Sequence, residues 1–370
     1  MKYLGIDLGG TNVAAAVVDS EGTILGKVSL PTPRGAEAVA DQMAAAARGA
    51  AEAAGTALDE VVSVGIGAPG AIEPDTGVIK YWSNLDFTNV PITALMKARL
   101  DKEILLENDA NAAALGEYAA GAGKGSQSMV AVTLGTGVGG GAILNGKLYT
   151  GFNYAGMEIG HFVIEHGGRL CTCGRRGCFE AYCSATALIK RTRQVMEEDR
   201  TSRLWELAGS LEGVNGRTPF DAAAQGDPAA GKVIDEYVDY LGCGVASLVN
   251  IFQPEVICIG GGPSAQGETL MAPVRYILNR EDYARNNLHR TRLALCVVVA
   301  VALYAAAGKV PPLEPYRPWL EEHKVQAIAI TAAILFGLSL LLFPPEEGGA
   351  EPAAPEEGPC AGYERTEDLP

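Results

Sequence analysis

The chain has 370 residues, of which 48% are hydrophobic and 20% are charged, and its formal net charge is −15. This composition predicts a folded protein with room for two cores, and it excludes disorder over most of the chain. The negative charge disfavours contact with a phosphate backbone, so we expect no nucleic-acid partner. The chain begins in a strand pattern without a signal-peptide pattern, which predicts a cytoplasmic protein whose eight cysteines are thiols or metal ligands.

The first half of the chain alternates short apolar runs with an Ala-rich stretch, a pattern typical of an α/β domain. Strands are predicted over 2–7, 12–18, 23–29, 61–66 and 104–107. Helices are predicted over 36–54 and 109–122.

The second half repeats this opening. The predicted elements are strands over 129–134, 140–144 and 147–149, a helix over 229–252, a strand over 256–259 and a helix over 264–279. In each half a strand, a glycine turn and a hairpin come first, so we predict a duplicated α/β architecture with a cleft between the halves. We place one domain at 1–117 and the second at 118–292.

The chain changes character after residue 292. Residues 293–301 predict a further strand, and 293–343 as a whole form atypical apolar segments. Residues 325–343 carry no charge, and at about 1.5 Å per residue they are long enough to cross a ~30 Å bilayer core. We expect either membrane association through 325–343 or an apolar tail that packs on the body. Residues 344–370, with eight acidic residues and one basic residue, predict a disordered acidic tail.

Three glycine turns follow apolar strands. They are Asp7-Leu8-Gly9-Gly10-Thr11-Asn12, Gly135-Thr136-Gly137 and Gly260-Gly261-Gly262. Backbone N–H groups at such turns form a cradle for anionic oxygens, and in a duplicated layout the three together favour a nucleotide. Each turn alone is also compatible with a plain chain reversal.

The carboxylate of Asp7 ends the first predicted strand beside a glycine turn. A carboxylate there would repel phosphate unless a cation lay between them, so Mg²⁺ is its natural partner. The alternative is that Asp7 only caps the turn.

A second carboxylate, Asp109, lies where a predicted strand gives way to a helix. Asp at a helix start is often a cap. The functional alternative is a general base that accepts a hydroxyl proton as the oxygen attacks a γ-phosphorus. The neighbouring Asn108 would then hold an adjacent hydroxyl.

Three cysteines and one histidine lie within eighteen residues of one another: His161, Cys171, Cys173 and Cys178. Thiolate and imidazole are preferred ligands of structural zinc, although ordinary buried thiols are the alternative. A zinc ion here would brace the loop and fix where Glu158, His161 and Glu180 point. These side chains are suited to hold sugar hydroxyls.

Taken in order, these motifs resemble the ROK family of sugar kinases, especially its bacterial ATP-dependent glucokinases. The resemblance covers residues 1 to about 290. It is carried by 7–11, 67–70 (Gly-Ala-Pro-Gly), 107–111 (Glu-Asn-Asp-Ala-Asn), 134–137, 158–161 (Glu-Ile-Gly-His), the cysteine cluster and 259–262.

The resemblance implies an actin-like, hexokinase-type (ribonuclease H-like) two-domain fold with ATP and sugar in the interdomain cleft. It implies phosphorylation of glucose at the 6-hydroxyl, with Mg-ATP as donor and Asp109 as base. The implied sugar ligands are Asn108, Glu158, His161, Glu180, Gly70 and Asn84. The implied ligands of a structural Zn²⁺ are His161, Cys171, Cys173 and Cys178. Family members are often dimers or tetramers, so we expect a homo-oligomer.

Two alternatives remain open at this point. The sugar could be another hexose, such as N-acetylmannosamine or fructose, because pocket details decide only a few kcal/mol of specificity. The protein could instead be a non-catalytic sugar-binding protein or a transcriptional regulator of the same family. The first strand at residue 2 leaves no room for an N-terminal helix-turn-helix, which disfavours the regulator.

Overall fold

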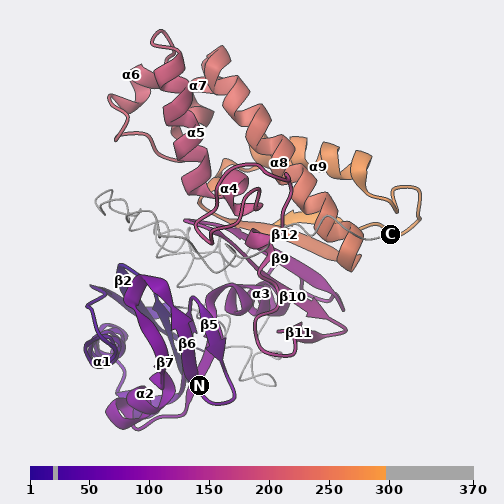
Figure 1. The fold of residues 1–370 in the computed structure, drawn as a ribbon. Coiled ribbons are helices and arrows are strands. Elements are labelled where there is room, and N and C mark those ends of the chain that lie inside the picture. Colours follow the sequence, from indigo (N-terminus) through magenta and orange to yellow (C-terminus); the bar gives the residue numbers. More distant parts are fainter. Residues whose placement is uncertain (20–23, 297–370) are drawn as a thin grey trace, which may run out of the picture.

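The computed structural model describes residues 1–19 and 24–296, and two five-stranded sheets organise it (Figure 1). The first sheet has the order β3-β2-β1-β4-β8. Its strands are β1 (Lys2–Leu8), β2 (Asn12–Asp19), β3 (Ile24–Pro31), β4 (Val61–Ala68) and β8 (Ile104–Asn108). β1, β2 and β3 are antiparallel, whereas β4 and β8 run parallel to β1.

The second sheet repeats this arrangement. Its order is β11-β10-β9-β12-β13, with an antiparallel β9–β10–β11 meander and with β12 and β13 parallel to β9. Its strands are β9 (Met129–Leu134), β10 (Val138–Leu144), β11 (Lys147–Tyr149), β12 (Val256–Gly261) and β13 (Arg292–Leu295). The identical order and strand directions confirm the predicted duplication.

Helices cover both sheets. They are α1 (Ala36–Ala53), α2 (Ile92–Leu100), α3 (Asp109–Ala120), α4 (Glu180–Cys183), α5 (Ala185–Glu198), α6 (Leu204–Ala208), α7 (Thr218–Ala224), α8 (Pro228–Phe252) and α9 (Glu268–Glu281). Short 3₁₀ turns are η1 (Leu58–Glu60), η2 (Ser83–Leu85), η3 (Ile159–His161) and η4 (Gly262–Gln266). A small sheet of β5 (Ala71–Glu73), β6 (Val78–Trp82) and β7 (Phe87–Val90) completes the first half.

Each half has its own apolar core. In the first, Val39 and Met43 of α1 pack with Leu4 and Ile6 of β1. In the second, α8 supplies much of the core, beginning at Pro228, where the Asp227 side chain accepts a hydrogen bond from the Ala230 N–H. This N-cap and the proline in the first turn explain why α8 begins there.

The helix α3 follows the first sheet in sequence but packs on the second. It leaves β8 and contacts β9 and β10. The predicted boundary after residue 117 therefore falls inside α3, and the division into 1–117 and 118–292 stays a proposal.

Several element boundaries differ from the predictions. The helix predicted over 264–279 begins at Glu268, because η4 and a left-handed Gly267 (φ 57°) come first. The strand predicted over 140–144 begins earlier, at Val138. β13 covers the start of the strand predicted over 293–301 and ends at Leu295, and residues 297–301 are not described.

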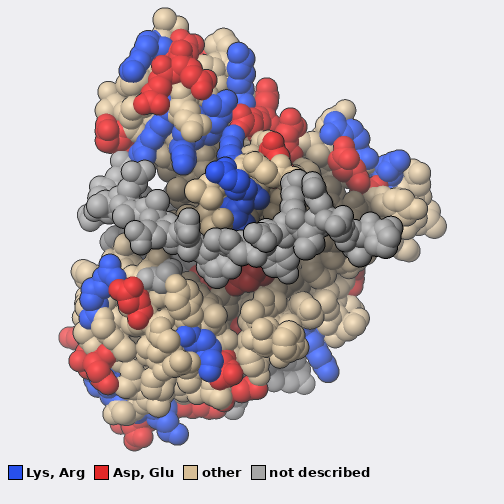
Figure 2. Space-filling model, in the orientation of Figure 1, with Lys and Arg blue, Asp and Glu red and all other residues tan. Residues whose placement is uncertain are grey.

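No helix among residues 1–19 and 24–296 is both long and apolar enough to cross a membrane. The candidate membrane segment 325–343 and the acidic tail 344–370 lie outside the described residues. On the face in Figure 2, acidic and basic side chains are mixed over the described surface.

Candidate active site

The parallel strands of both sheets place their carboxyl ends side by side. In the first sheet Asp7 is in register with Gly67, and Gly67 with Glu107. In the second sheet Gly261 is in register with Leu134. The glycine turns and the Asn108–Asp109 pair come directly after these positions, at the edge where α/β sheets bind ligands.

A cavity of about 330 Å³ has walls from both halves. The first half contributes Pro69, Gly70, Asn84, Asn108, Asp109 and Ala110, and the second contributes Gly139, Gly140, Gly156, Met157, Glu158, His161, Thr172 and Glu180. All seven residues predicted to act on the sugar therefore line one cavity. The predicted phosphate-turn residues are not among its lining.

Asn108, rather than Asp109, is the N-cap of α3. The Asn108 Oδ1 accepts hydrogen bonds from the N–H groups of Ala110 (3.0 Å) and Asn111 (3.2 Å). This use of Oδ1 leaves the Asn108 NH₂ group as a donor toward the cavity. Asp109 is the first residue of the helix, and its Oδ1 also accepts a hydrogen bond from the Ala110 N–H.

The Asp109 carboxyl has an elevated pKa. Burial is the main cause and raises the pKa to about 6, with a further contribution from the nearby Glu158 carboxylate. The Ala110 N–H, which donates to Asp109 Oδ1 at 2.8 Å, acts in the opposite direction. A carboxylate with this pKa is ionised at neutral pH and is a stronger base than an exposed aspartate.

Glu158 and Glu180 face Asp109 from the second half. Burial raises the pKa of Glu158, and the Glu180 carboxylate adds to this effect, while His161 opposes it. Glu180 accepts hydrogen bonds from the Thr172 hydroxyl at 3.1 Å and from the Val138 N–H at 3.1 Å. Glu180 therefore joins the cysteine loop to the β9–β10 turn.

The cysteine cluster has the geometry of a metal site. The ligand atoms of His161, Cys171, Cys173 and Cys178 all lie within 4.8 Å of one another. Cys173 Sγ and Cys178 Sγ are 3.7 Å apart, and Cys171 Sγ is 3.7 Å from His161 Nδ1. A tetrahedral zinc with ~2.3 Å Zn–S bonds places two sulfurs about 3.8 Å apart, so these residues fit the ion.

Metal binding at the cluster would have to be coupled to loss of the thiol protons. Burial raises the pKa of the Cys171 and Cys178 thiols. The thiolates that bind metal would therefore form only with a positive charge beside them. With Nδ1 on the cluster side, Nε2 is the ring nitrogen left for the cavity.

The glycines of the three glycine turns differ in how much space the surrounding residues leave for a side chain. A Cβ on Gly9 would lie 2.9 Å from the Asn12 carbonyl oxygen, and one on Gly261 would lie 2.1 Å from that of Leu134. The turn itself requires glycine at these positions. A Cβ on Gly262 would meet no atom of the described residues within 4 Å, so packing among them does not require a glycine there.

Residues 3–301 match the model of the ROK family. The chain belongs to the ROK family. A glucokinase from Thermotoga maritima is 42% identical over 278 residues, which cover 74% of this chain and 86% of that protein. A structure of a ROK family glucokinase from Streptomyces griseus in complex with glucose and AMPPNP is 36% identical, with a TM-score of 0.71, and covers 80% of this chain and 94% of that one.

The family also contains kinases named for other sugars. An N-acetylmannosamine kinase from Yersinia pseudotuberculosis is 36% identical over 261 residues, covering 70% of this chain and 82% of that protein. The ROK relationship confirms the predicted actin-like, hexokinase-type fold, because the matched solved structures include a ROK glucokinase and a ROK hexokinase.

Sequence reasoning missed part of this ROK cavity. Thr172 lies between two of the clustered cysteines, and its hydroxyl bonds Glu180. A polar residue between two candidate metal ligands was the available signal. Outside the cluster, Cys183 and Cys258 are buried, whereas Cys243 on α8 is exposed.

Proposed function

We propose that this ROK-family protein is an ATP-dependent glucokinase that phosphorylates glucose at the 6-hydroxyl. The observation that carries the proposal is the single cavity in which Asp109 of the first half faces Glu158, His161 and Glu180 of the second. A basic carboxylate opposite several hydroxyl-binding groups is the arrangement that phosphoryl transfer to a sugar requires.

The sugar is held by groups of complementary hydrogen-bonding character. Glu158 and Glu180 accept from sugar hydroxyls, while the Asn108 NH₂ group and His161 Nε2 donate to them. Gly70 and Asn84 close the side of the cavity that the first half forms. These contacts orient the 6-hydroxyl so that Asp109 accepts its proton as the oxygen attacks the γ-phosphorus.

The nucleotide is assigned to the glycine turns. The backbone of Gly9, Gly10, Thr11 and Asn12 and that of Gly135, Thr136 and Gly137 would hold the phosphates, and Gly260, Gly261 and Gly262 would lie against the adenosine. Asp7 is only 3% exposed at the end of β1 and is our candidate for orienting Mg²⁺. When bound, Mg²⁺ neutralises charge on the transferring phosphoryl group.

Zinc is proposed as a structural ion held by His161, Cys171, Cys173 and Cys178. When bound, it supplies the charge that keeps the thiolates ionised and a rigid connection between η3 and the cysteine loop. The chain's own residues then fix the sugar ligands, because His161 and Glu180 lie directly against this loop.

An assay of hexose-dependent ADP release tests the function. Purified protein is given ATP, Mg²⁺ and each member of a panel containing glucose, fructose and N-acetylmannosamine. We expect glucose to give the highest kcat/KM. A preference for N-acetylmannosamine or fructose would transfer the proposal to that sugar, and sugar binding without ADP release would favour a regulator. The homo-oligomer and the cytoplasmic location stay predictions.

A further inference from the structure

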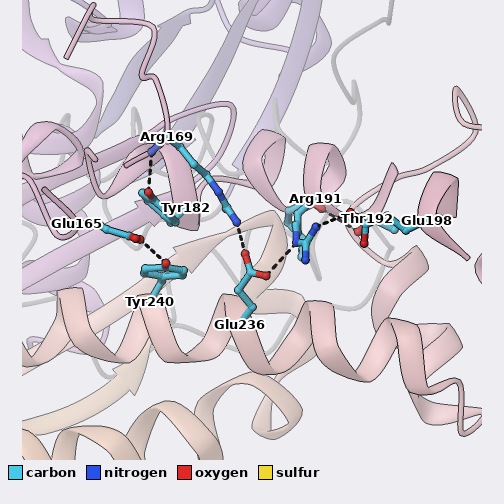
Figure 3. A network of polar contacts seen from close by, with 9 residues as sticks. Glu165, Arg169, Tyr182, Arg191, Thr192, Glu198, Glu236 and Tyr240 are labelled. Atoms are coloured by element: carbon cyan, nitrogen blue, oxygen red, sulfur yellow. Dashed lines mark hydrogen bonds and ion pairs between the residues drawn. The ribbon is translucent and has the colours of Figure 1, made fainter. Parts of the chain in front are cut away.

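An arginine outside the cavity connects the cysteine loop to the long helix of the second half (Figure 3). Residues 163–178 form a small hairpin, with bridges between Val163 and Cys178 and between Leu170 and Arg176. We call this segment the zinc hairpin. Arg169 lies on it, two residues before the metal-ligand candidate Cys171.

The Arg169 side chain contacts two aromatic rings and one carboxylate. Its guanidinium carbon lies 4.5 Å from the ring centroid of Tyr182 and 5.8 Å from that of Tyr240. It forms an ion pair with Glu236 of α8. Planar stacking combined with a charged partner is an arrangement that favours arginine over lysine.

The backbone of the hairpin is fixed at the same place. The Arg169 N–H donates to the Tyr182 hydroxyl at 2.7 Å, and the Gly177 N–H donates to the Arg169 carbonyl at 2.8 Å. The Tyr240 hydroxyl donates to Glu165 near the start of the hairpin. α8 therefore holds the zinc hairpin through contacts that include none of the four metal-ligand candidates.

Tyr182 connects this anchor to the sugar side of the hairpin. It lies on α4, two residues after Glu180, and is only 3% exposed. Its ring also packs on Tyr240, with centroids 4.1 Å apart. A shift of the ring would move α4 and with it the Glu180 carboxylate.

We infer that Arg169 is a positioning residue, which holds Glu180 in place by a route independent of the metal. The hairpin thus has two anchors, the His161–cysteine cluster on one side and the Arg169–Tyr182–Tyr240–Glu236 assembly on the other. The effect on glucose rests on the proposed function, whereas the effect on the hairpin does not.

Arg191 on α5 provides a matched control. It pairs with the same Glu236 carboxylate at 2.9 Å, and its side chain is 27% exposed, compared with 35% for Arg169. Its other ion-pair partner is Glu198 on its own helix. Arg191→Ala therefore removes the same charge beside Glu236 without releasing the hairpin.

The experiment compares the full-length wild type with Arg169→Ala, Arg169→Lys and Arg191→Ala. We expect Arg169→Ala to raise the glucose KM about tenfold, with smaller changes in kcat and in the ATP KM, as for loss of one charge-assisted contact. Arg169→Lys, which keeps the charge but loses the planar stacking, should give an intermediate KM. Zinc content should stay at the wild-type value in all three variants.

A second readout needs no activity. Arg175 and Arg176 are exposed at the tip of the hairpin, so trypsin cleavage there, followed by mass spectrometry, reports release of the hairpin. Cleavage should be faster in Arg169→Ala and unchanged in Arg191→Ala. Equal cleavage and equal KM in these two variants would overturn the inference, as would loss of zinc from Arg169→Ala. A wild type without hexokinase activity would refute the proposed function while leaving the proteolysis test valid.

Discussion

At the start of α3, Asn108 is the N-cap, and the adjacent Asp109 is the proposed general base. The sequence placed a carboxylate where either a cap or a base would fit, and no local pattern decided between them. In the structure the Asn108 side chain accepts capping hydrogen bonds from Ala110 and Asn111, which supports the role of Asp109 as the base but leaves that role a proposal. Burial is the main cause of the elevated pKa of Asp109, and the carboxylate of Glu158, which is distant in sequence, adds to it, so no local motif could have predicted the shift.

The pH dependence of kcat/KM should follow ionisation of Asp109. Its pKa is raised to about 6, so the carboxyl is protonated below that pH and cannot accept the sugar proton. We expect kcat/KM to fall about tenfold per pH unit below pH ~6 and to be level above it. Glu158→Gln removes a like charge and should move the acidic limb to lower pH. If the acidic limb of the kcat/KM profile stays at the same pH or moves to higher pH in Glu158→Gln, the assignment of this limb to Asp109 is contradicted.

Gly262→Ala tests the nucleotide role of the third glycine turn. Because a Cβ there meets no atom of residues 1–19 and 24–296 within 4 Å, the described fold should tolerate the change, while the ATP KM should rise several-fold. Gly231→Ala is the control, since its Cβ also meets nothing, on the helix α8. It should leave the ATP KM unchanged and add about 0.5–1 kcal/mol of stability. Equal ATP KM values in Gly262→Ala and Gly231→Ala would contradict a nucleotide-binding role for the third glycine turn.

At the scale of elements, apolar runs beside a clear turn were predictable, and several other elements, both long and short, were not. The apolar runs of β9 and β11 and the helix α8 appear within one residue of their predicted ends. The three-residue strand β5, the four-residue helix α4 and the 14-residue helix α5 were missed. All three have non-local contacts that a local pattern does not show: β5 lies against β8, and α4 and α5 pack on α8.

Cys173→Ser tests whether the metal cluster braces the sugar site. The serine hydroxyl is a poor zinc ligand, so zinc should be lost. Because Cys171 and His161 then lose their shared ion, Glu180 and His161 should become less ordered and the glucose KM should rise about tenfold. Zinc is measured by elemental analysis beside the kinetics. A zinc-free variant with normal sugar affinity would show that the metal does not position the sugar ligands.

At the scale of the molecule, the duplication and the cleft between the halves were predicted, whereas the strand order of the two sheets was not. Two strand–turn–hairpin openings indicated duplication, and both sheets have the same order. Which side chains meet across the halves depends on how α3 packs on the second sheet, which has no local signal. The motifs of the family resemblance supplied the sugar-ligand set that the cavity brings together.

Glucose should stabilise the folded protein as one cooperative unit, since both halves form the cavity walls. At a concentration of 100 Kd, linkage predicts about 2.7 kcal/mol and a rise in Tm of about 5 °C. Thermal denaturation across the hexose panel measures this. A rise with N-acetylmannosamine but none with glucose would reassign the preferred sugar.

The most direct test of the account is glucose-dependent ADP release by Asp109→Asn, with glucose affinity measured on the same sample. The asparagine keeps the shape of the side chain but cannot take up the hydroxyl proton. We expect glucose affinity close to that of the wild type and turnover reduced by a factor of ~10²–10⁴. Turnover near the wild-type rate with intact glucose binding would contradict the role of Asp109 as the base.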